Sequence, residues 1–151
     1  MGRSIRFYVE ALGAEAVTRP FTIEGEFAEA MFEGPAGVAF RLCHLRFESG
    51  MLELFEFERP RHEADPIHPS AANIMHLGFV VDDVEATVAR VLAAGGRLVF
   101  PVTEWGENRL TYVTDPDGTV IELADAPLEQ LLVGTLEQFP EADPRLGAVE
   151  N

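Results

Sequence analysis

Apolar and polar residues alternate along "MHLGFVVDD", residues 75–83, as they do in a strand with one buried face. Leu77, Phe79 and Val81 share one face of this strand, and His76 lies on the other face. Four apolar residues then follow at helical spacing, at positions 84, 88, 91 and 92, and the glycine pair at 95–96 ends that pattern. With Asp82 as the N-cap of a capping box, the segment predicts a strand, a helix and a stop.

Three more strands are expected after this helix. The segment "RLVFPVTEW", residues 97–105, predicts a strand that Pro101 closes or places at a sheet edge. Segments 109–115 and 119–125 flank "DPDG", whose proline and glycine favour a type I turn and therefore an antiparallel hairpin. Residues 74–124 thus predict a β-α-β-β-β unit.

The first half of the chain repeats most of this order. Apolar residues at positions 5, 8, 9 and 12 predict a helix that Gly13 ends, and strands are expected at 16–23, 38–47 and 51–57. Gly13 and Gly96 are 83 residues apart, and "LEL" and "IEL" occupy the matching last strands. We therefore expect an internal repeat of roughly 70–85 residues whose first unit lacks an opening strand.

Changes in composition predict the domain organisation. Residues 58–73 are rich in proline and polar residues and predict a linker between modules at 1–57 and 74–127. Together these form one expected domain, 1–127, followed by a C-terminal helix and tail at 128–151. The helix has an apolar stripe, which we expect to dock on this chain or on a partner chain. The stripe consists of Leu128, Leu131, Leu132 and Leu136.

Charge and cysteine content narrow the possible partners. The 151 residues include 11 basic and 26 acidic side chains, and a net charge of −15 disfavours binding to nucleic acid or anionic membranes. A single cysteine, Cys43, excludes a disulfide within the chain and fits a reducing cytoplasm. No apolar run approaches the roughly 20 residues that a membrane-spanning helix needs. We expect a cytoplasmic protein that binds a small molecule or another protein.

Three residues on predicted strands are candidates for metal chemistry: Glu53, His76 and Glu122. Phosphate-loop, dinucleotide-binding, serine-hydrolase and C-x-x-C motifs are all absent from the sequence. A carboxylate on a buried strand costs free energy unless it is paired, hydrogen-bonded or bound to a metal. Histidine and carboxylate ligands suit a divalent cation that acts as a Lewis acid. Taken singly, each of the three is more often a solvated or core residue, so both interpretations stay open.

Four segments in sequence order resemble the vicinal oxygen chelate superfamily of glyoxalases, bleomycin-resistance proteins and dioxygenases. They are "RSIRFYVEALG", "LELFEF", "HLGFVVDDVEATVARVLAAGG" and "YVTDPDGTVIEL". The resemblance implies an α+β fold in which two βαβββ modules form an open half-barrel around a metal. By position, it makes His76 and Glu122 the first-strand and last-strand ligands of the second module, and Glu53 the last-strand ligand of the first. The fourth ligand would precede Met1, so we expect either an upstream start or a lost first strand.

The same resemblance implies an enzyme with a divalent metal (Zn, Ni, Mn, Co or Fe) and a small substrate that chelates it through two neighbouring oxygens. Isomerase, lyase or dioxygenase chemistry through a stabilised enolate is then expected, with Glu122 as the preferred catalytic base. The segment "ELFEFERP" lacks the asparagine with which bacterial glyoxalase I contacts glutathione, which disfavours lactoylglutathione. The alternative is a metal-free protein that binds a small molecule or drug, as bleomycin-resistance members do. Members of the family commonly form homodimers.

Several other side chains are candidates to line a substrate pocket. They are Arg41, His44, Phe57, Trp105, Arg109 and Tyr112. Arg109 is either a binding group for a carboxylate or phosphate, or a surface arginine. Trp105 is either a lid over the cavity or part of the core. His44 is a candidate metal ligand only if the first strand is truly absent, and the family offers no precedent at its position.

Overall fold

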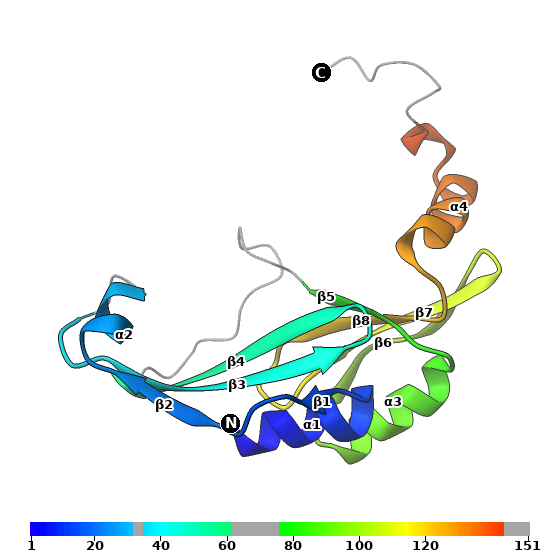
Figure 1. Ribbon diagram of the computed structural model, residues 1–151. Coiled ribbons are helices and arrows are strands. Elements are labelled where there is room, and N and C mark those ends of the chain that lie inside the picture. The colour runs from blue at the N-terminus through cyan, green and yellow to red at the C-terminus, as the bar shows by residue number, and fades with distance from the viewer. Residues whose placement is uncertain (32–34, 62–75, 144–151) are drawn as a thin grey trace.

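The computed structural model describes residues 1–31, 35–61 and 76–143, whose elements are labelled in Figure 1. The helices are α1 (Gly2–Leu12), α2 (Glu26–Met31), α3 (Val84–Ala93) and α4 (Leu128–Gln138), followed by the short 3-10 helix η1 (Pro140–Ala142). The strands are β1 (Glu15–Ala16), β2 (Phe21–Glu24), β3 (Ala39–Phe47), β4 (Gly50–Arg59), β5 (Leu77–Val80), β6 (Arg97–Trp105), β7 (Asn108–Thr114) and β8 (Val120–Ala124). None of the described helices is long and apolar enough to cross a membrane.

The strands form two four-stranded sheets, one for each predicted module. In the second sheet the order is β5-β8-β7-β6, with β5 parallel to β8 and the other pairs antiparallel. In the first sheet β4 pairs with one edge of β3, and β1 and β2 pair in turn with its other edge. Among the described strands, none pairs with the outer edge of β4, the place that β5 takes beside β8. The α+β fold with two repeated, unclosed modules is thereby confirmed.

The single strand predicted at 16–23 is wrong, because this segment forms β1 and β2 with an irregular stretch between them. At that stretch the Thr18 hydroxyl accepts a hydrogen bond from the His44 backbone N–H at 3.0 Å, in place of a backbone carbonyl. Pro20, just before β2, has no N–H to donate to a strand ladder. The short helix α2, which follows β2, was not predicted either.

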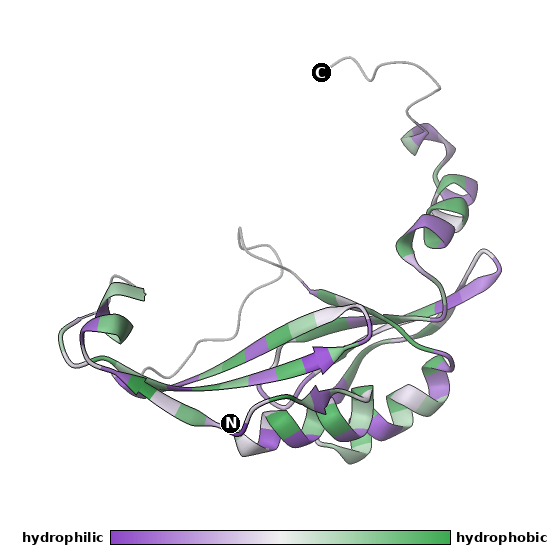
Figure 2. Cartoon of the chain, in the orientation of Figure 1, coloured by the Kyte–Doolittle hydropathy of each residue, from purple (hydrophilic) through white to green (hydrophobic). Residues whose placement is uncertain are grey.

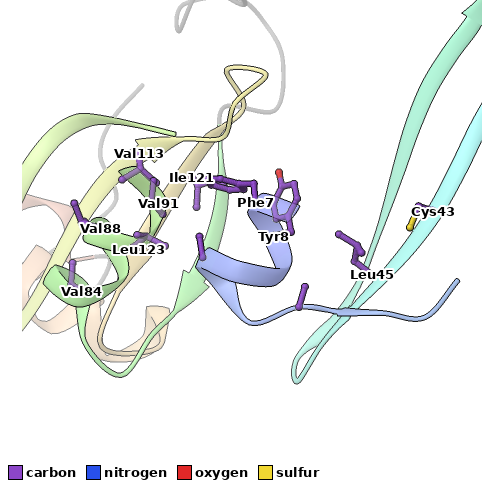
Figure 3. Packing of buried hydrophobic residues seen from close by; sticks show 12 residues of the cluster. Phe7, Tyr8, Cys43, Leu45, Val84, Val88, Val91, Val113, Ile121 and Leu123 are labelled. Carbon is purple, nitrogen blue, oxygen red and sulfur yellow. The ribbon is translucent and has the colours of Figure 1, made fainter. Parts of the chain in front are cut away.

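One hydrophobic core joins the two modules. Helices α1 and α3 lie side by side beneath the sheets (Figure 1) and contribute to a single buried cluster (Figure 3). Hydrophobic and hydrophilic residues alternate along β3 and β4 (Figure 2), so that Cys43 and Leu45 enter this core while His44 between them faces the opposite side. Ile121 and Leu123 flank Glu122 in the same way in β8. The sheet faces opposite α1 and α3 therefore carry the candidate polar residues, and α2 and α4 pack on other parts of these same faces.

Helix α3 begins one residue later than the sequence predicts. The N-cap is Asp83, whose Oδ1 accepts a hydrogen bond from the Ala86 N–H at 2.8 Å, and not Asp82. The reason is that the Val81 N–H still bonds to the Ala124 carbonyl at 2.8 Å, which keeps the chain extended beyond β5. Asp82 therefore lies in the turn between the extended chain and the helix.

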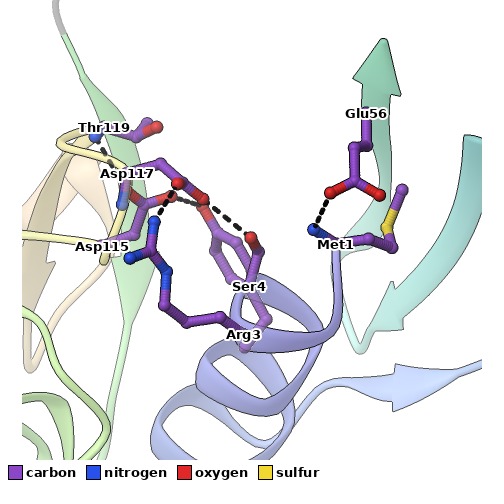
Figure 4. A network of polar contacts seen from close by, with 8 residues as sticks. Met1, Arg3, Ser4, Glu56, Asp115, Asp117 and Thr119 are labelled. Carbon is purple, nitrogen blue, oxygen red and sulfur yellow. Dashed lines mark hydrogen bonds and ion pairs between the residues drawn. The ribbon is translucent and has the colours of Figure 1, made fainter. Parts of the chain in front are cut away.

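The predicted hairpin of β7 and β8 is confirmed, and a polar network ties its turn to α1 (Figure 4). Asp115 Oδ1 accepts hydrogen bonds from the N–H groups of Asp117 and Thr119, at 2.8 and 2.9 Å. The Tyr8 hydroxyl donates to Asp115 Oδ2 at 2.9 Å, and the Ser4 hydroxyl donates to Asp117 at 2.7 Å. Burial, followed by the charge of Asp115, raises the pKa of Tyr8. Helix α1 of the first module is therefore fixed to the second module by hydrogen bonds as well as by the core.

Helix α4 docks on the end of the second sheet where β6 turns into β7. The Trp105 indole N–H donates to the Leu131 carbonyl at 3.1 Å, and Leu131 is buried among residues of β7 and β8. Leu128 and Leu132 of the predicted apolar stripe remain exposed, at 67% and 49%. Docking on this chain therefore covers only part of the stripe.

Two further sequence predictions concern the sheet edge and the connecting segments. Strand β6 is the outer strand of its sheet, as Pro101 indicates, and its register is irregular between Leu98 and Thr103. Residues 62–73 of the predicted linker and residues 144–151 of the predicted tail lie outside the described residues.

Candidate functional site

His76 and Glu122 meet at the junction of β5 and β8. Because β5 pairs in parallel with β8, Gly78 lies opposite Glu122 and brings the preceding His76 to the same face. His76 Nε2 lies 2.9 Å from Glu122 Oε2, and the Glu122 side chain is 17% exposed. The structure thus brings together the two residues that the sequence singled out on the first and last strands of the second module.

Tyr112 completes this group from the neighbouring strand. It lies opposite Glu122 in the β7–β8 hairpin, and its ring meets that of His76 edge-on at a centroid distance of 5.3 Å. Burial, followed by the negative charge of Glu122 and a hydrogen bond to that carboxylate, raises the pKa of Tyr112. Tyr112 therefore keeps its phenolic proton at neutral pH and is a hydrogen-bond donor toward Glu122.

The second ring nitrogen of His76, Nδ1, has a different environment from that of Nε2. His76 Nδ1 is buried and has no hydrogen-bond partner within the described part of the chain. A histidine that binds a metal normally donates its other ring N–H to a neighbouring acceptor, which fixes the ring. His76 lacks that support in these residues, where its ring contacts Tyr112 and Glu122.

Glu53 has a histidine partner of its own on the other sheet. It lies opposite His44 in the β3–β4 hairpin, and His44 Nε2 is 3.0 Å from Glu53 Oε1. His44 Nδ1 lies 3.2 Å from the Thr18 hydroxyl, and Phe21 stacks on the imidazole at an interplanar angle of 14°. The roles of Thr18 and Phe21 were missed at the sequence level, because they come from the irregular segment before and within β2 and no motif marks them.

The two histidine–glutamate pairs have the donor types and spacing of ligands to a divalent cation. Two donors about 2.1 Å from a cation, on adjacent corners of an octahedron, are roughly 3.0 Å apart. Both pairs match this separation. However, no three histidine, cysteine, aspartate or glutamate side chains converge to hold a metal among residues 1–31, 35–61 and 76–143. Glu53 therefore does not join His76 and Glu122, and each module presents a two-residue half-site.

Three of the proposed pocket residues lie away from these half-sites. Arg109 Nη1 pairs with Glu85 of α3 at 2.6 Å, and Arg109 is on the face of β7 opposite Tyr112 because three positions separate them. Its ion pair with Glu85 and its position on the other face separate Arg109 from the pair formed by His76 and Glu122. Trp105 is partly buried and packs against the cluster that joins α4 to β7 and β8. Arg41 pairs with Glu56 at 3.3 Å on the helix side of the first sheet.

Phe57 lies on the same face of β4 as Glu53, four residues further along the strand. Its ring packs against that of Phe40 at a centroid distance of 5.5 Å. It therefore shares the face of the pair formed by Glu53 and His44. A groove of about 410 Å³ runs beside β4, lined by residues 52–56 of that strand, by α1 and by Leu77. Glu53 is part of the lining of this groove.

Comparisons with known proteins identify the family of the chain. Residues 1–123 match the model of the glyoxalase/bleomycin resistance protein/dioxygenase superfamily. The chain is 35% identical over 119 residues to the uncharacterized protein YaeR of Escherichia coli strain K12, covering 78% of this chain and 81% of YaeR. It is 29% identical over 149 residues to a probable chloroplastic lactoylglutathione lyase of Arabidopsis thaliana, covering 91% of this chain and 38% of that protein.

A solved structure supports the fold independently. The crystal structure of a glyoxalase family protein from Bacillus cereus superimposes with a TM-score of 0.74 at 25% identity, covering 82% of this chain and 85% of that one. The family model, which matches residues 1–123, spans the segments that carry Glu53, His76 and Glu122. The chain therefore belongs to the glyoxalase/bleomycin resistance protein/dioxygenase superfamily.

Proposed function

We propose that this protein is a metal-dependent enzyme that acts on a small molecule with two neighbouring oxygens, one of them a carbonyl. The observation that carries the proposal is the pair formed by His76 and Glu122, with Tyr112 beside the carboxylate. Isomerase or lyase chemistry is favoured over dioxygenase chemistry, because a relative is described as a lactoylglutathione lyase.

His76, Glu122 and Glu53 are the residues that would hold the cation. When bound, a divalent metal polarises the substrate carbonyl and stabilises the negative charge that develops on its oxygen. The identity of the metal falls among Zn, Ni, Mn, Co and Fe, all of which accept imidazole and carboxylate ligands.

Glu122 is the proposed base, which removes a proton from the carbon next to the carbonyl. A carboxylate is suited to this step when it lies within hydrogen-bond reach of the substrate and is shielded from water. Its side chain is largely buried between His76 and Tyr112. The Tyr112 hydroxyl, which keeps its proton, orients the carboxylate by donating a hydrogen bond to it.

A second copy of the chain is proposed to complete the site, so that Glu53 of one protomer joins His76 and Glu122 of the other. The basis is that the described residues of one chain form two half-sites and no group of three ligands. The sheet faces that carry them also expose large apolar side chains of the kind that pair across homodimer interfaces. These are Phe21, Met51 and Phe57 in the first sheet, and Val80 and Phe100 in the second.

A metal-free protein that binds a small molecule or drug is the second candidate. The observation that favours it is the buried Nδ1 of His76, which has no partner in the described residues where a metal ligand would normally have one. In this alternative the exposed aromatic and aliphatic side chains of the sheet faces form the binding surface.

Metal content and proton exchange test the proposal together. Purified protein should contain a stoichiometric divalent metal by elemental analysis, and should exchange the carbon-bound proton of methylglyoxal hemithioacetals with deuterium from solvent. Glu122→Gln should abolish the exchange while leaving the protein folded by circular dichroism. A metal-free protein without exchange activity that nevertheless binds hydrophobic small molecules would overturn the proposal in favour of the second candidate.

A further inference from the structure

His44 and Tyr112 occupy equivalent places in the two modules. Each lies on the next-to-last strand of its module, directly opposite the glutamate of the last strand: His44 opposite Glu53, and Tyr112 opposite Glu122. The first module thus carries an imidazole where the second carries a phenol. A neutral phenol donates a hydrogen bond to the carboxylate, whereas an imidazole can also bind a cation through a ring nitrogen.

The surroundings of His44 fix its ring with Nε2 directed at Glu53. The Thr18 hydroxyl lies 3.2 Å from Nδ1 and also accepts the backbone N–H of His44 at 3.0 Å. A hydroxyl oxygen has two acceptor lone pairs, so it can accept the Nδ1 proton and the backbone proton together. In that tautomer Nε2 has a lone pair facing the Glu53 carboxylate, and a positive species between them satisfies both groups.

Two observations favour a cation in that place over a proton alone. The first is that His44 has the oxygen partner at Nδ1 that metal-binding histidines typically have, which His76 lacks within the described residues. The second is access: the side chains of His44 and Glu53 are 24% and 49% exposed, on the sheet face opposite α1 and α3. The separation of 3.0 Å between Nε2 and Oε1 leaves room for two cis ligands of one ion.

We infer that His44 is a metal ligand that binds through Nε2 together with Glu53, and that Thr18 is the residue that positions its ring. The first module then contributes a histidine and a glutamate, as the second contributes His76 and Glu122. In the tautomer with the ring proton on Nδ1, the cation binds the lone pair of Nε2 and no proton has to leave the imidazole. This inference rests on the proposed metal dependence and on the proposed completion of the site by a second copy, and it names a ligand from the next-to-last strand of the first module.

Metal binding and spectroscopy test this inference without an activity assay. The full chain is loaded with Co²⁺ or Zn²⁺, the affinity is measured by competition with a chromogenic chelator, and imidazole ligands are counted by X-ray absorption spectroscopy. The variants are His44→Phe, which keeps the ring stack on Phe21, and Thr18→Val, which removes only the hydroxyl. Arg46→Ala is the matched control, because Arg46 lies on the same face of β3 and pairs with the exposed Glu15.

The expected result is that wild-type protein binds metal with two imidazole ligands, and His44→Phe with one. Removal of the Thr18 hydroxyl should weaken binding by about 10–100-fold, the usual effect of losing an outer hydrogen-bond partner. Arg46→Ala should bind as wild type does. All variants are compared by circular dichroism and thermal unfolding, and His44→Gln serves as a second variant if His44→Phe fails to fold.

The outcomes separate this inference from the proposed function. If His44→Phe binds metal with the affinity and imidazole count of wild type while Glu122→Gln no longer binds metal, His44 is not a ligand and the metalloenzyme proposal stands. If wild type binds no metal, both fail. A His44 that only hydrogen-bonds to Glu53 predicts an unchanged imidazole count in Thr18→Val and His44→Phe alike, which would overturn the inference.

Discussion

Gly134 of α4 lies so close to Gly106, in the turn between β6 and β7, that a methyl group on Gly134 would come within 2.8 Å of the Gly106 nitrogen. The same methyl group would be 2.8 Å from the Trp105 ring, whose indole N–H also donates to the Thr135 hydroxyl at 3.2 Å. The backbones of the helix and the turn therefore touch directly. This contact fixes α4 at the end of the second sheet.

Gly134→Ala should detach or displace α4. Overpacking of this kind typically costs about 1–3 kcal/mol, although alanine is the better helix former. We expect faster amide exchange in α4 and a red shift of the fluorescence of Trp105, the single tryptophan of the chain. Gly2→Ala in α1 is the matched control, because a methyl group there meets no atom within 4 Å. Equal exchange rates in the two variants would contradict the close packing.

Tyr8→Phe should destabilise the whole fold although it removes one oxygen atom. The hydroxyl donates to the buried Asp115, which would lose one partner of its carboxylate. The expected decrease in the free energy of unfolding is about 1–3 kcal/mol, measured by urea denaturation. Asp115→Asn and the double variant complete a thermodynamic cycle. A coupling energy near zero would show that Tyr8 and Asp115 contribute independently.

Stability should decrease at alkaline pH because the pKa of both tyrosines is raised in the folded state. The unfolded chain loses its tyrosine protons near pH 10, whereas the folded chain still holds them, so each pH increase above about 10 favours unfolding. Absorbance at 295 nm during an alkaline titration should therefore rise together with the loss of far-ultraviolet circular dichroism. Ionisation of either tyrosine in the still-folded protein near pH 10 would contradict this expectation.

Ser4→Ala should destabilise the protein at neutral pH and have less effect in acid. Burial acts to raise the pKa of Asp117, but hydrogen bonds from Ser4 and Arg3 outweigh it, so the pKa is lowered overall. A lowered folded-state pKa contributes stability above the pKa of the unfolded chain, about 3.9, and this stability is lost as pH falls through the folded value. Unfolding midpoints of wild type and variant should converge as the pH falls through that range. A constant difference down to pH 2 would assign the effect of Ser4 to packing.

The meeting of His76 with Glu122 could be predicted because the family resemblance assigns one ligand to the first strand of the module and one to its last. Side-chain alternation then puts both on the face away from Ile121 and Leu123. The same parity excludes Arg109 from the face of Tyr112, since the two are an odd number of residues apart in one strand. The prediction that placed Arg109 and Tyr112 in one pocket did not take this alternation of side chains into account.

The surroundings of His44 could not be predicted in the same way. Thr18 reaches it through a stretch with no regular hydrogen-bond ladder, where the hydroxyl replaces a backbone acceptor. Which side chains such a stretch places near a strand depends on its irregular path and not on a sequence period. The N-cap of α3 is Asp83 and not the predicted Asp82 for a related reason: the hydrogen bond from the Val81 N–H to the Ala124 carbonyl keeps the chain extended beyond β5.

The single cluster shared by α1 and α3 makes the two repeats dependent on each other. Phe7 of the first repeat and Val91 of the second are both fully buried in it, so a separated half would expose apolar side chains that the other half now covers. We expect one cooperative unfolding transition rather than two. Substitutions in the helix of one repeat therefore depend on the helix of the other repeat. The effect of a substitution at Phe7 on stability is determined by the side chains that the second repeat packs against it.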